Sequence, residues 1–211
     1  SQLIAMLVIG AAFMGASISI RDLVGERAVF LRERAVGLPV SAYLGSKLLV
    51  FGLLSAFMAG MLTYVTLLAK TPPIQSIYFS SPALELFLSL MLTALAAMVT
   101  GLLLSSLVKS SEQVMPLFVV FLMAQLVLNG GLLPITAGSF ISAAATLVIA
   151  RWGFAMSASS TNLAAISPSL DEDPFWAHNL YIWGTSAAML IGTAIILVTL
   201  TRLRLDGKYD R

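Results

Sequence analysis

Five stretches of the chain contain no charged residue, and each is long enough to cross a membrane. No Asp, Glu, Lys or Arg occurs within residues 1–20, 48–69, 86–108, 113–150 and 174–201. A helix needs about 20 apolar residues to span the hydrocarbon core of a bilayer. The stretches are continuously apolar, whereas strands of a membrane barrel alternate between apolar and polar positions. The pattern therefore predicts an all-α membrane protein.

Polar and helix-breaking residues set the limits of the predicted elements. We expect spans at 3–20, 48–69, 83–108, 114–129 and 180–201, with a basic tail at 202–211. The uncharged stretch 113–150 is too long for one span and short for two with a loop. We therefore expect a re-entrant or surface-lying helix at 139–150, closed by Arg151 and Trp152 and followed by an external segment, 151–179.

The densest charge cluster lies between the first two spans and predicts a short helix at 26–37. Its charged side chains are Glu26, Arg27, Arg32, Glu33 and Arg34. None has an opposite charge three or four residues away within the helix, so we expect all of them to point outward unpaired, around an exposed Phe30. An interfacial helix that extends its arginines toward lipid headgroups explains the arginines. A helix that offers mixed charge and an aromatic ring to a soluble partner also explains the glutamates and Phe30.

Lysine and arginine are distributed unequally between the loops on the two sides of the membrane. Five spans place 21–47, 109–112 and the tail on one side, with ten Lys or Arg residues, whereas the other side has only Lys70 and Arg151. Loops rich in Lys and Arg stay in the cytoplasm. The charged helix and the C-terminus are therefore expected to be cytoplasmic, in a multi-pass protein of the plasma membrane.

Composition agrees with a membrane protein and limits the chemistry. Charged residues make up 10% of the 211 residues, against about 25% in soluble domains. With no Cys and a single His, His178, a metal centre is not expected. The pair of Ser17 and His178 is a weak candidate for an intramembrane serine protease. Glu85 is either a proton-relay carboxylate or, as we expect, a solvated group at headgroup level.

The charged helix and the start of the next span resemble the connecting helix of ABCG-type exporters, which belong to the type II (ABC-2) exporter class. The resemblance is carried by Glu26-Arg-Ala-Val-Phe30, Arg32-Glu33, Gly37, Ser41-Ala-Tyr43 and Lys47. Gly131-Leu-Leu133 is similar to the family's paired-leucine plug, and Arg151-Trp-Gly-Phe154 to the segment in which its re-entrant external helix returns. The likeness covers essentially the whole chain and is closest to bacterial members, such as actinobacterial exporters with FHA domains upstream.

This resemblance implies an ABC-2 transmembrane domain with five of the family's six spans, because the first span would lie upstream of this sequence. The ATP-binding domain would also lie upstream, or in a separate chain. It implies a homodimer that moves amphipathic or lipid-like cargo outward, and no nucleic-acid partner. This chain would then be no enzyme and hold no cofactor of its own, since ATP and Mg²⁺ bind the nucleotide-binding domain.

The resemblance also implies roles for particular residues. Glu26, Arg27, Phe30, Arg32, Glu33 and Arg34 would couple to the nucleotide-binding domain, Leu132 and Leu133 would form the extracellular gate, and Met14, Val120, Ala124, Val127 and Leu128 would line the cavity. Met14 replaces an aromatic that clamps flat drugs in some members, which puts that specificity in doubt. The alternative function is a non-transporting membrane scaffold that recruits a cytoplasmic protein through the same helix.

Overall fold

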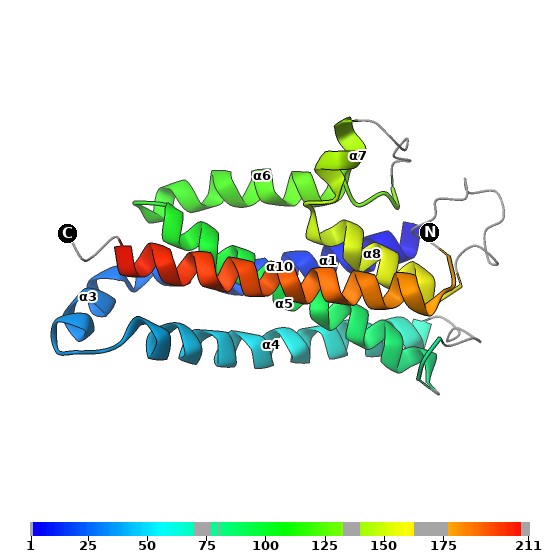
Figure 1. Ribbon diagram of the computed structural model, residues 1–211, viewed down its shortest axis with the longest axis horizontal. Helices are drawn as coiled ribbons and strands as arrows, with labels where there is room; N and C mark the ends of the chain where they lie inside the picture. The colour runs from blue at the N-terminus through cyan, green and yellow to red at the C-terminus, as the bar shows by residue number, and fades with distance from the viewer. Residues whose placement is uncertain (1, 70–76, 80, 133–139, 163–176, 208–211) are drawn as a thin grey trace.

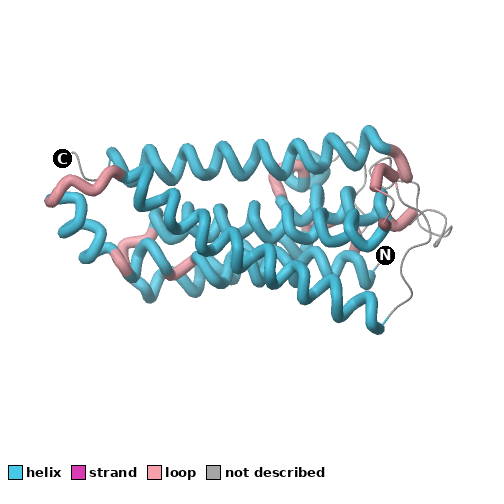
Figure 2. Tube along the Cα trace, turned by 90° about the horizontal axis from the view of Figure 1, so that it is seen from below, coloured by secondary structure: helices cyan, strands magenta, loops and turns pink. Residues whose placement is uncertain are grey.

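The helix α5 (Pro82–Leu107) lies at the centre of an elongated helical bundle (Figures 1 and 2). The computed structural model describes residues 2–69, 77–79, 81–132, 140–162 and 177–207, and every regular element among them is a helix. The helices packed against α5 are α1 (Gln2–Ser19), α4 (Val40–Ala69), α8 (Ile149–Ser160) and α10 (Leu180–Gly207). The all-α fold expected from the sequence is therefore confirmed.

Small residues allow α1 and α5 to pack closely. A side chain at Gly15 would place its Cβ atom 2.1 Å from the carbonyl oxygen of Ala94, so only glycine fits at this crossing. One turn further along the pair, Ser19 Oγ donates a hydrogen bond to the Met98 carbonyl at 2.7 Å. Small residues at helix crossings are the usual means of packing inside a bilayer, where apolar side chains gain little by leaving lipid.

Four helices are long and apolar enough to cross a membrane: 2–25, in which the short helix α2 (Asp22–Gly25) continues α1, together with α4, α5 and α10. The span predicted at 114–129 is the shorter helix α6 (Val114–Val127), which follows a 3₁₀ turn at Ser111–Gln113. α5 is buried along most of its length, whereas α4 and α10 expose most of their apolar surface. The exposed surfaces of α4 and α10 suit contact with lipid.

Two long helices extend beyond the limits predicted from the sequence. α4 begins at Val40 rather than at residue 48, because the helix starts directly after Pro39 and carries its polar first turns outside the apolar stretch. α10 continues to Gly207, so that Arg202 and Arg204 are helical and do not belong to a separate tail.

The helix predicted at 139–150 is two helices, and its predicted end is wrong. α7 (Phe140–Ala145) is followed by α8, which runs through Arg151 and Trp152 to Ser160. α8 is buried against α1, α5 and α10 (Figure 1). Residues 151–160, which open the segment expected to be external at 151–179, are therefore part of the core of the bundle. Residues 163–176 of that segment lie outside the described residues.

The two ends of the bundle are formed by different segments. The helix α3 (Arg27–Ala35), the turn before α6 and the C-terminal end of α10 lie at one end (Figure 1). The start of α1, the start of α5 and α8 lie toward the other end. The fold thus brings together at one end the described segments that the Lys and Arg count assigned to one side of the membrane.

Candidate functional site

α3 is a charged helix fastened to the bundle by one buried aromatic side chain. Phe30 is only 2% exposed, and its ring centroid lies 4.5 Å from that of Tyr43 on α4. Both belong to a core cluster that also contains Leu44 of α4 and Leu205 of α10. The expectation that Phe30 is exposed was wrong, because α4 and α10 enclose the side of α3 that carries it.

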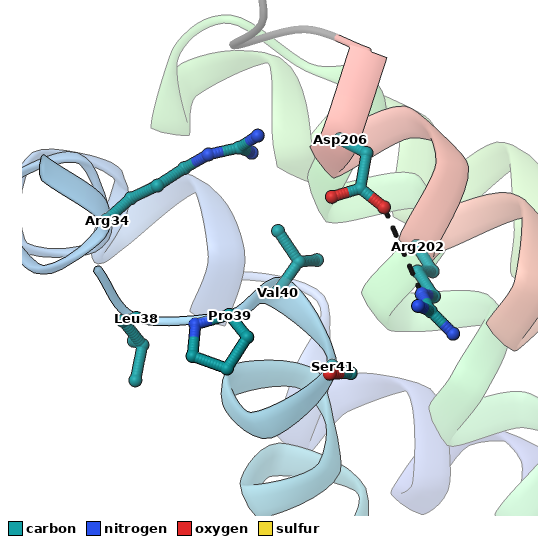
Figure 3. Close-up of a pocket in the computed structure, with 7 residues that line it drawn as sticks. All are labelled: Arg34, Leu38, Pro39, Val40, Ser41, Arg202 and Asp206. Carbon is teal, nitrogen blue, oxygen red and sulfur yellow. Dashed lines mark ion pairs between the residues drawn. The ribbon is translucent and has the colours of Figure 1, made fainter.

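The charged side chains of α3 surround this anchor and differ in exposure. Arg32 and Glu33 are exposed, and Arg34 is half-buried. The Arg34 guanidinium extends toward α10 (Figure 3), where its Nη1 atom donates a hydrogen bond to the Leu205 carbonyl at 3.0 Å. Gly37, with φ +107°, ends the helix in the left-handed conformation that favours glycine. The charged surface of α3 therefore has a defined position relative to α4 and α10.

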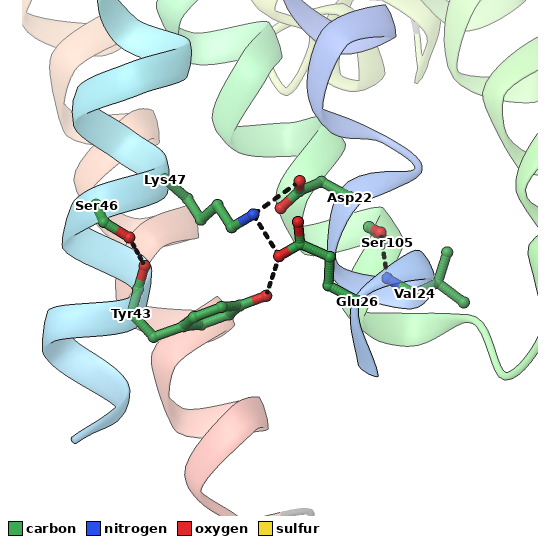
Figure 4. Close-up of polar contacts among 7 residues, drawn as sticks. All are labelled: Asp22, Val24, Glu26, Tyr43, Ser46, Lys47 and Ser105. Atoms are coloured by element: carbon green, nitrogen blue, oxygen red, sulfur yellow. Dashed lines mark hydrogen bonds and ion pairs between the residues drawn. The ribbon is translucent and has the colours of Figure 1, made fainter. Parts of the chain in front are cut away.

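A lysine joins the segment before α3 to α4. Lys47 Nζ lies 3.0 Å from Asp22 Oδ1 and also pairs with Glu26 Oε2, which accepts a hydrogen bond from the Tyr43 hydroxyl at 3.3 Å (Figure 4). Asp22 and Glu26 are four residues apart, a spacing at which like charges repel on a helix, so Lys47 neutralises an otherwise unfavourable pair. The expectation that Glu26 is unpaired was wrong, because its partner lies on another helix.

The segment between α1 and α3 is also fixed to the central helix. The backbone N–H of Val24 in α2 donates to Ser105 Oγ of α5 at 3.1 Å (Figure 4). Leu23 is buried in the same cluster as Phe30. A displacement of α3 would therefore disturb α1, α4, α5 and α10 together, through contacts made by a few side chains.

At the other end of α6, an asparagine shapes the segment that contains the predicted gate. Asn129 Oδ1 accepts hydrogen bonds from the N–H groups of Gly131 at 2.6 Å and Leu132 at 3.1 Å. A side chain at Gly131 would lie 2.4 Å from the ring of Phe154 on α8. Leu132 is half-buried against the cluster that contains Phe154, whereas Leu133 lies outside the described residues. Residues 129–132 thus form a tight turn packed on α8.

Four of the five predicted cavity residues lie on the neighbouring helices α1 and α6, and the fifth, Leu128, directly follows α6. The rings of Phe13 on α1 and Phe118 on α6 have centroids 5.6 Å apart. The predicted residues occupy different environments: Met14 and Ala124 are half-buried, Val120 and Val127 are exposed, and Leu128 packs against the core. Neither exposed valine is part of the core of this chain.

Glu85 is completely buried, contrary to the expectation of a solvated carboxylate. Its oxygens accept hydrogen bonds from the backbone N–H groups of Ile77, Tyr78 and Phe79. The carboxylate therefore holds the loop before α5 against the bundle. His178 has a local partner as well, since its Nδ1 lies 2.7 Å from the Ser159 carbonyl oxygen.

Sequence reasoning missed most of these polar partners, although two of them had a signal. Asp22 and Glu26, and likewise Tyr43 and Lys47, are four residues apart, so each pair shares one helix face. For Asn129 the only signal in the sequence was the Gly-Gly pair that follows it, which is typical of a turn. Within the described parts of the chain, no group of three or more His, Cys, Asp or Glu side chains is placed to hold a metal ion.

Comparison with known proteins agrees with this architecture. The family described as ABC-2 type transporter matches residues 2–163. The chain is also 40% identical over 210 residues to an ABC transporter ATP-binding/permease protein of Mycobacterium tuberculosis, and it spans about a quarter (24%) of that relative's length. The relative is bacterial, as the resemblance implied. The chain therefore belongs to the ABC-2 type transporter family and is a membrane-spanning permease domain of that kind.

Proposed function

We propose that this domain carries amphipathic or lipid-like cargo outward across the plasma membrane, driven by ATP hydrolysis in a nucleotide-binding domain that contacts α3. The observation that carries the proposal is the way α3 is built: Arg32 and Glu33 are exposed at its surface, and Phe30 is buried between it and the bundle. A helix that is charged outside and anchored inside is suited to receive a force from a soluble domain and to pass it to the bundle.

The relative's name supports an ATP-binding partner, because it couples an ATP-binding part and a permease in one protein. In this proposal ATP and Mg²⁺ bind that partner domain, on the same polypeptide or on a separate chain. The cytoplasmic placement of α3 and of the C-terminus is supported by the ten Lys and Arg residues on their side of the membrane, against two on the other.

The cargo path is proposed to lie between two copies of the domain. Phe13 on α1 and Val120 and Val127 on α6 are apolar, exposed and on adjacent helices. A path lined by these apolar side chains suits an amphipathic cargo better than an ion. In this arrangement Met14 and Ala124 face the path from the edge of the same surface, and Leu132 closes it on the outer side.

Movement begins at α3. Closure of two nucleotide-binding domains would push on Arg32 and Glu33, and the Lys47 pairs with Asp22 and Glu26 would pass the displacement to α1 and α4. Because α1 and α4 are rigid helices packed on α5, they would shift as units and narrow the cytoplasmic side of the path. The turn held by Asn129 would then release Leu132 toward the outside.

Charge reversal on α3 tests this proposal. We expect Glu33→Lys, in the full-length transporter in proteoliposomes, to lower the transport-coupled ATPase rate about tenfold, because one charge-assisted contact with the partner is worth about 1.5 kcal/mol. The matched control is Glu112→Lys, an exposed carboxylate of the turn before α6 on the same side of the bundle. Reaction of Glu33→Cys with an impermeant maleimide from the cytoplasmic side alone verifies the orientation.

The result also separates a transporter from a scaffold. An unchanged ATPase rate in correctly inserted Glu33→Lys, or an equal loss in Glu112→Lys, would refute the coupling role of α3. For a transporter, Leu132→Ala should leak cargo or change the ATPase rate. A scaffold that only recruits a cytoplasmic protein would be indifferent to Leu132→Ala and sensitive to Glu33→Lys in binding alone.

A further inference from the structure

A cavity of about 230 Å³ lies where the end of α3 and the start of α4 meet the end of α10 (Figure 3). Two arginines line it from different elements, Arg34 of α3 and Arg202 of α10. Ser41, in the first turn of α4, and Asp206 of α10 complete its polar lining. The lining charges sum to +1, which matches a singly charged anion.

The two arginines are held differently. Arg34 is tied to the last turn of α10 by its bond to the Leu205 carbonyl. The Nε atom of Arg202 lies 3.9 Å from Asp206 Oδ2 (Figure 3), which is longer than a charge-assisted hydrogen bond of about 2.8 Å. Arg202 is therefore only loosely paired with Asp206, so little interaction energy is lost when its side chain turns to another anion.

The surroundings of the cavity indicate what kind of molecule carries the anion. α4 and α10 expose most of their apolar surface. Exposed apolar side chains begin close to the cavity on both helices, with Leu203 next to Arg202 and with Leu49 two turns beyond Ser41. A charged cavity next to two lipid-facing helices fits a molecule with an anionic head and an apolar tail.

We propose that this cavity binds the phosphodiester headgroup of an anionic phospholipid. The planar guanidinium fork matches phosphate oxygens in pairs, which a carboxylate-lined or apolar cavity cannot do. The volume is below the range of about 300–1,000 Å³ for pockets that enclose a drug-sized ligand, so the cavity accommodates a headgroup and not a whole cargo molecule. The site is thus separate from the proposed transport path, and it requires no assumption about transport.

A bound headgroup would bridge α3 and α10. Arg34 already joins these two helices through Leu205, and a phosphate between Arg34 and Arg202 would add a second connection. Anionic lipid would therefore hold α3 in the position seen here. The composition of the inner leaflet would in this way regulate how readily α3 moves.

Calorimetry tests the site. It measures the affinity of dioctanoyl phosphatidylglycerol for the detergent-solubilised full-length protein in 0.5 M NaCl. At this salt concentration diffuse attraction is largely screened and direct contacts remain. We expect Arg34→Gln with Arg202→Gln to weaken binding at least tenfold, since hydrogen bonds to charged groups contribute about 1.5–3 kcal/mol. The matched control, Arg32→Gln with Arg204→Gln, removes the same charge from the same two helices outside the cavity and should change the affinity by less than about twofold.

One further variant and two further ligands test whether the lipid headgroup binds in this cavity. Asp206→Asn removes the only carboxylate that lines the described cavity and should strengthen binding by about threefold to fivefold, a gain that misfolding cannot produce. Dioctanoyl phosphatidylcholine, whose phosphate is neutralised by choline, should bind at least tenfold more weakly. Equal losses in both double variants, or an unchanged affinity in Asp206→Asn, would place the lipid elsewhere. Glycerol 3-phosphate binding as tightly as the lipid would show that the occupant is a soluble phosphate and overturn the lipid assignment.

Discussion

Replacement of Glu85 with Ala removes the acceptor of four backbone hydrogen bonds at the start of α5. The Oε1 atom accepts from the N–H groups of Ile77 at 2.9 Å, Tyr78 at 2.7 Å and Phe79 at 2.9 Å, and Oε2 accepts from Ile77 at 3.1 Å. The carboxylate is 0% exposed and lies in the first turn of the helix, where the N-terminal end of the helix dipole favours a negative charge.

The stability lost in Glu85→Ala depends on how the loop before α5 responds when the carboxylate is removed. Three N–H groups left buried without a partner would cost about 1–3 kcal/mol each. The loop can instead open to water, which limits the loss to that of the charge-assisted bonds, about 3–5 kcal/mol in total. Glu85→Gln keeps one oxygen able to accept the bonds now made to Oε1, so we expect it to cost about 1 kcal/mol.

Hydrogen–deuterium exchange of the peptide that covers Ile77, Tyr78 and Phe79 measures this directly. A loss of about 3 kcal/mol in local stability corresponds to a faster exchange by roughly 100-fold. We expect that change in Glu85→Ala, a smaller one in Glu85→Gln, and none in Glu112→Ala, an exposed carboxylate remote from this loop. Unchanged protection of these three amides in Glu85→Ala would show that the carboxylate does not hold the loop.

Two further substitutions test the packing that positions α1 and α3. Gly15→Leu would drive a Cβ atom to within 2.1 Å of the Ala94 carbonyl oxygen, so we expect α1 and α5 to separate and the purified protein to aggregate in size-exclusion chromatography; a monodisperse variant would contradict the crossing. Phe30→Ala should lower the stability of the fold by about 3–5 kcal/mol, because it leaves a cavity. Trypsin should then cleave within α3 faster. Leu31→Ala, at a 41% exposed position, should leave the cleavage rate nearly unchanged.

The features that the sequence could predict are those with a signal along the chain. Uncharged stretches longer than a membrane span predict helices wherever they occur, because a backbone inside lipid must satisfy its own hydrogen bonds. The charge cluster at 26–37 likewise predicted a surface helix, and α3 lies within it. The paired carboxylates Asp22 and Glu26 also share a face by their spacing alone, although their partner Lys47 does not follow from it.

Burial was harder to predict, because lipid-facing and core-facing side chains of a membrane helix are equally apolar. Periodicity therefore does not show which side of α4 or α10 meets the bundle. Arg151 illustrates the difficulty: an arginine beside a tryptophan is typical of a membrane surface, yet Arg151 is 5% exposed within α8. Its position depends on how α8 packs against the other helices.

The sequence by itself determined the class of the protein, the approximate helices and the concentration of basic residues on one side, since each of these depends on composition over a length of chain. The tertiary structure alone decided that Phe30 is an anchor, that Glu85 holds a loop and that Lys47 joins two helices. These roles depend on neighbours that are brought together by packing, with Lys47 and Asp22, for example, 25 residues apart in the chain. Contacts between helices are set by the shapes of several elements at once, and no pattern within one of them specifies its partner.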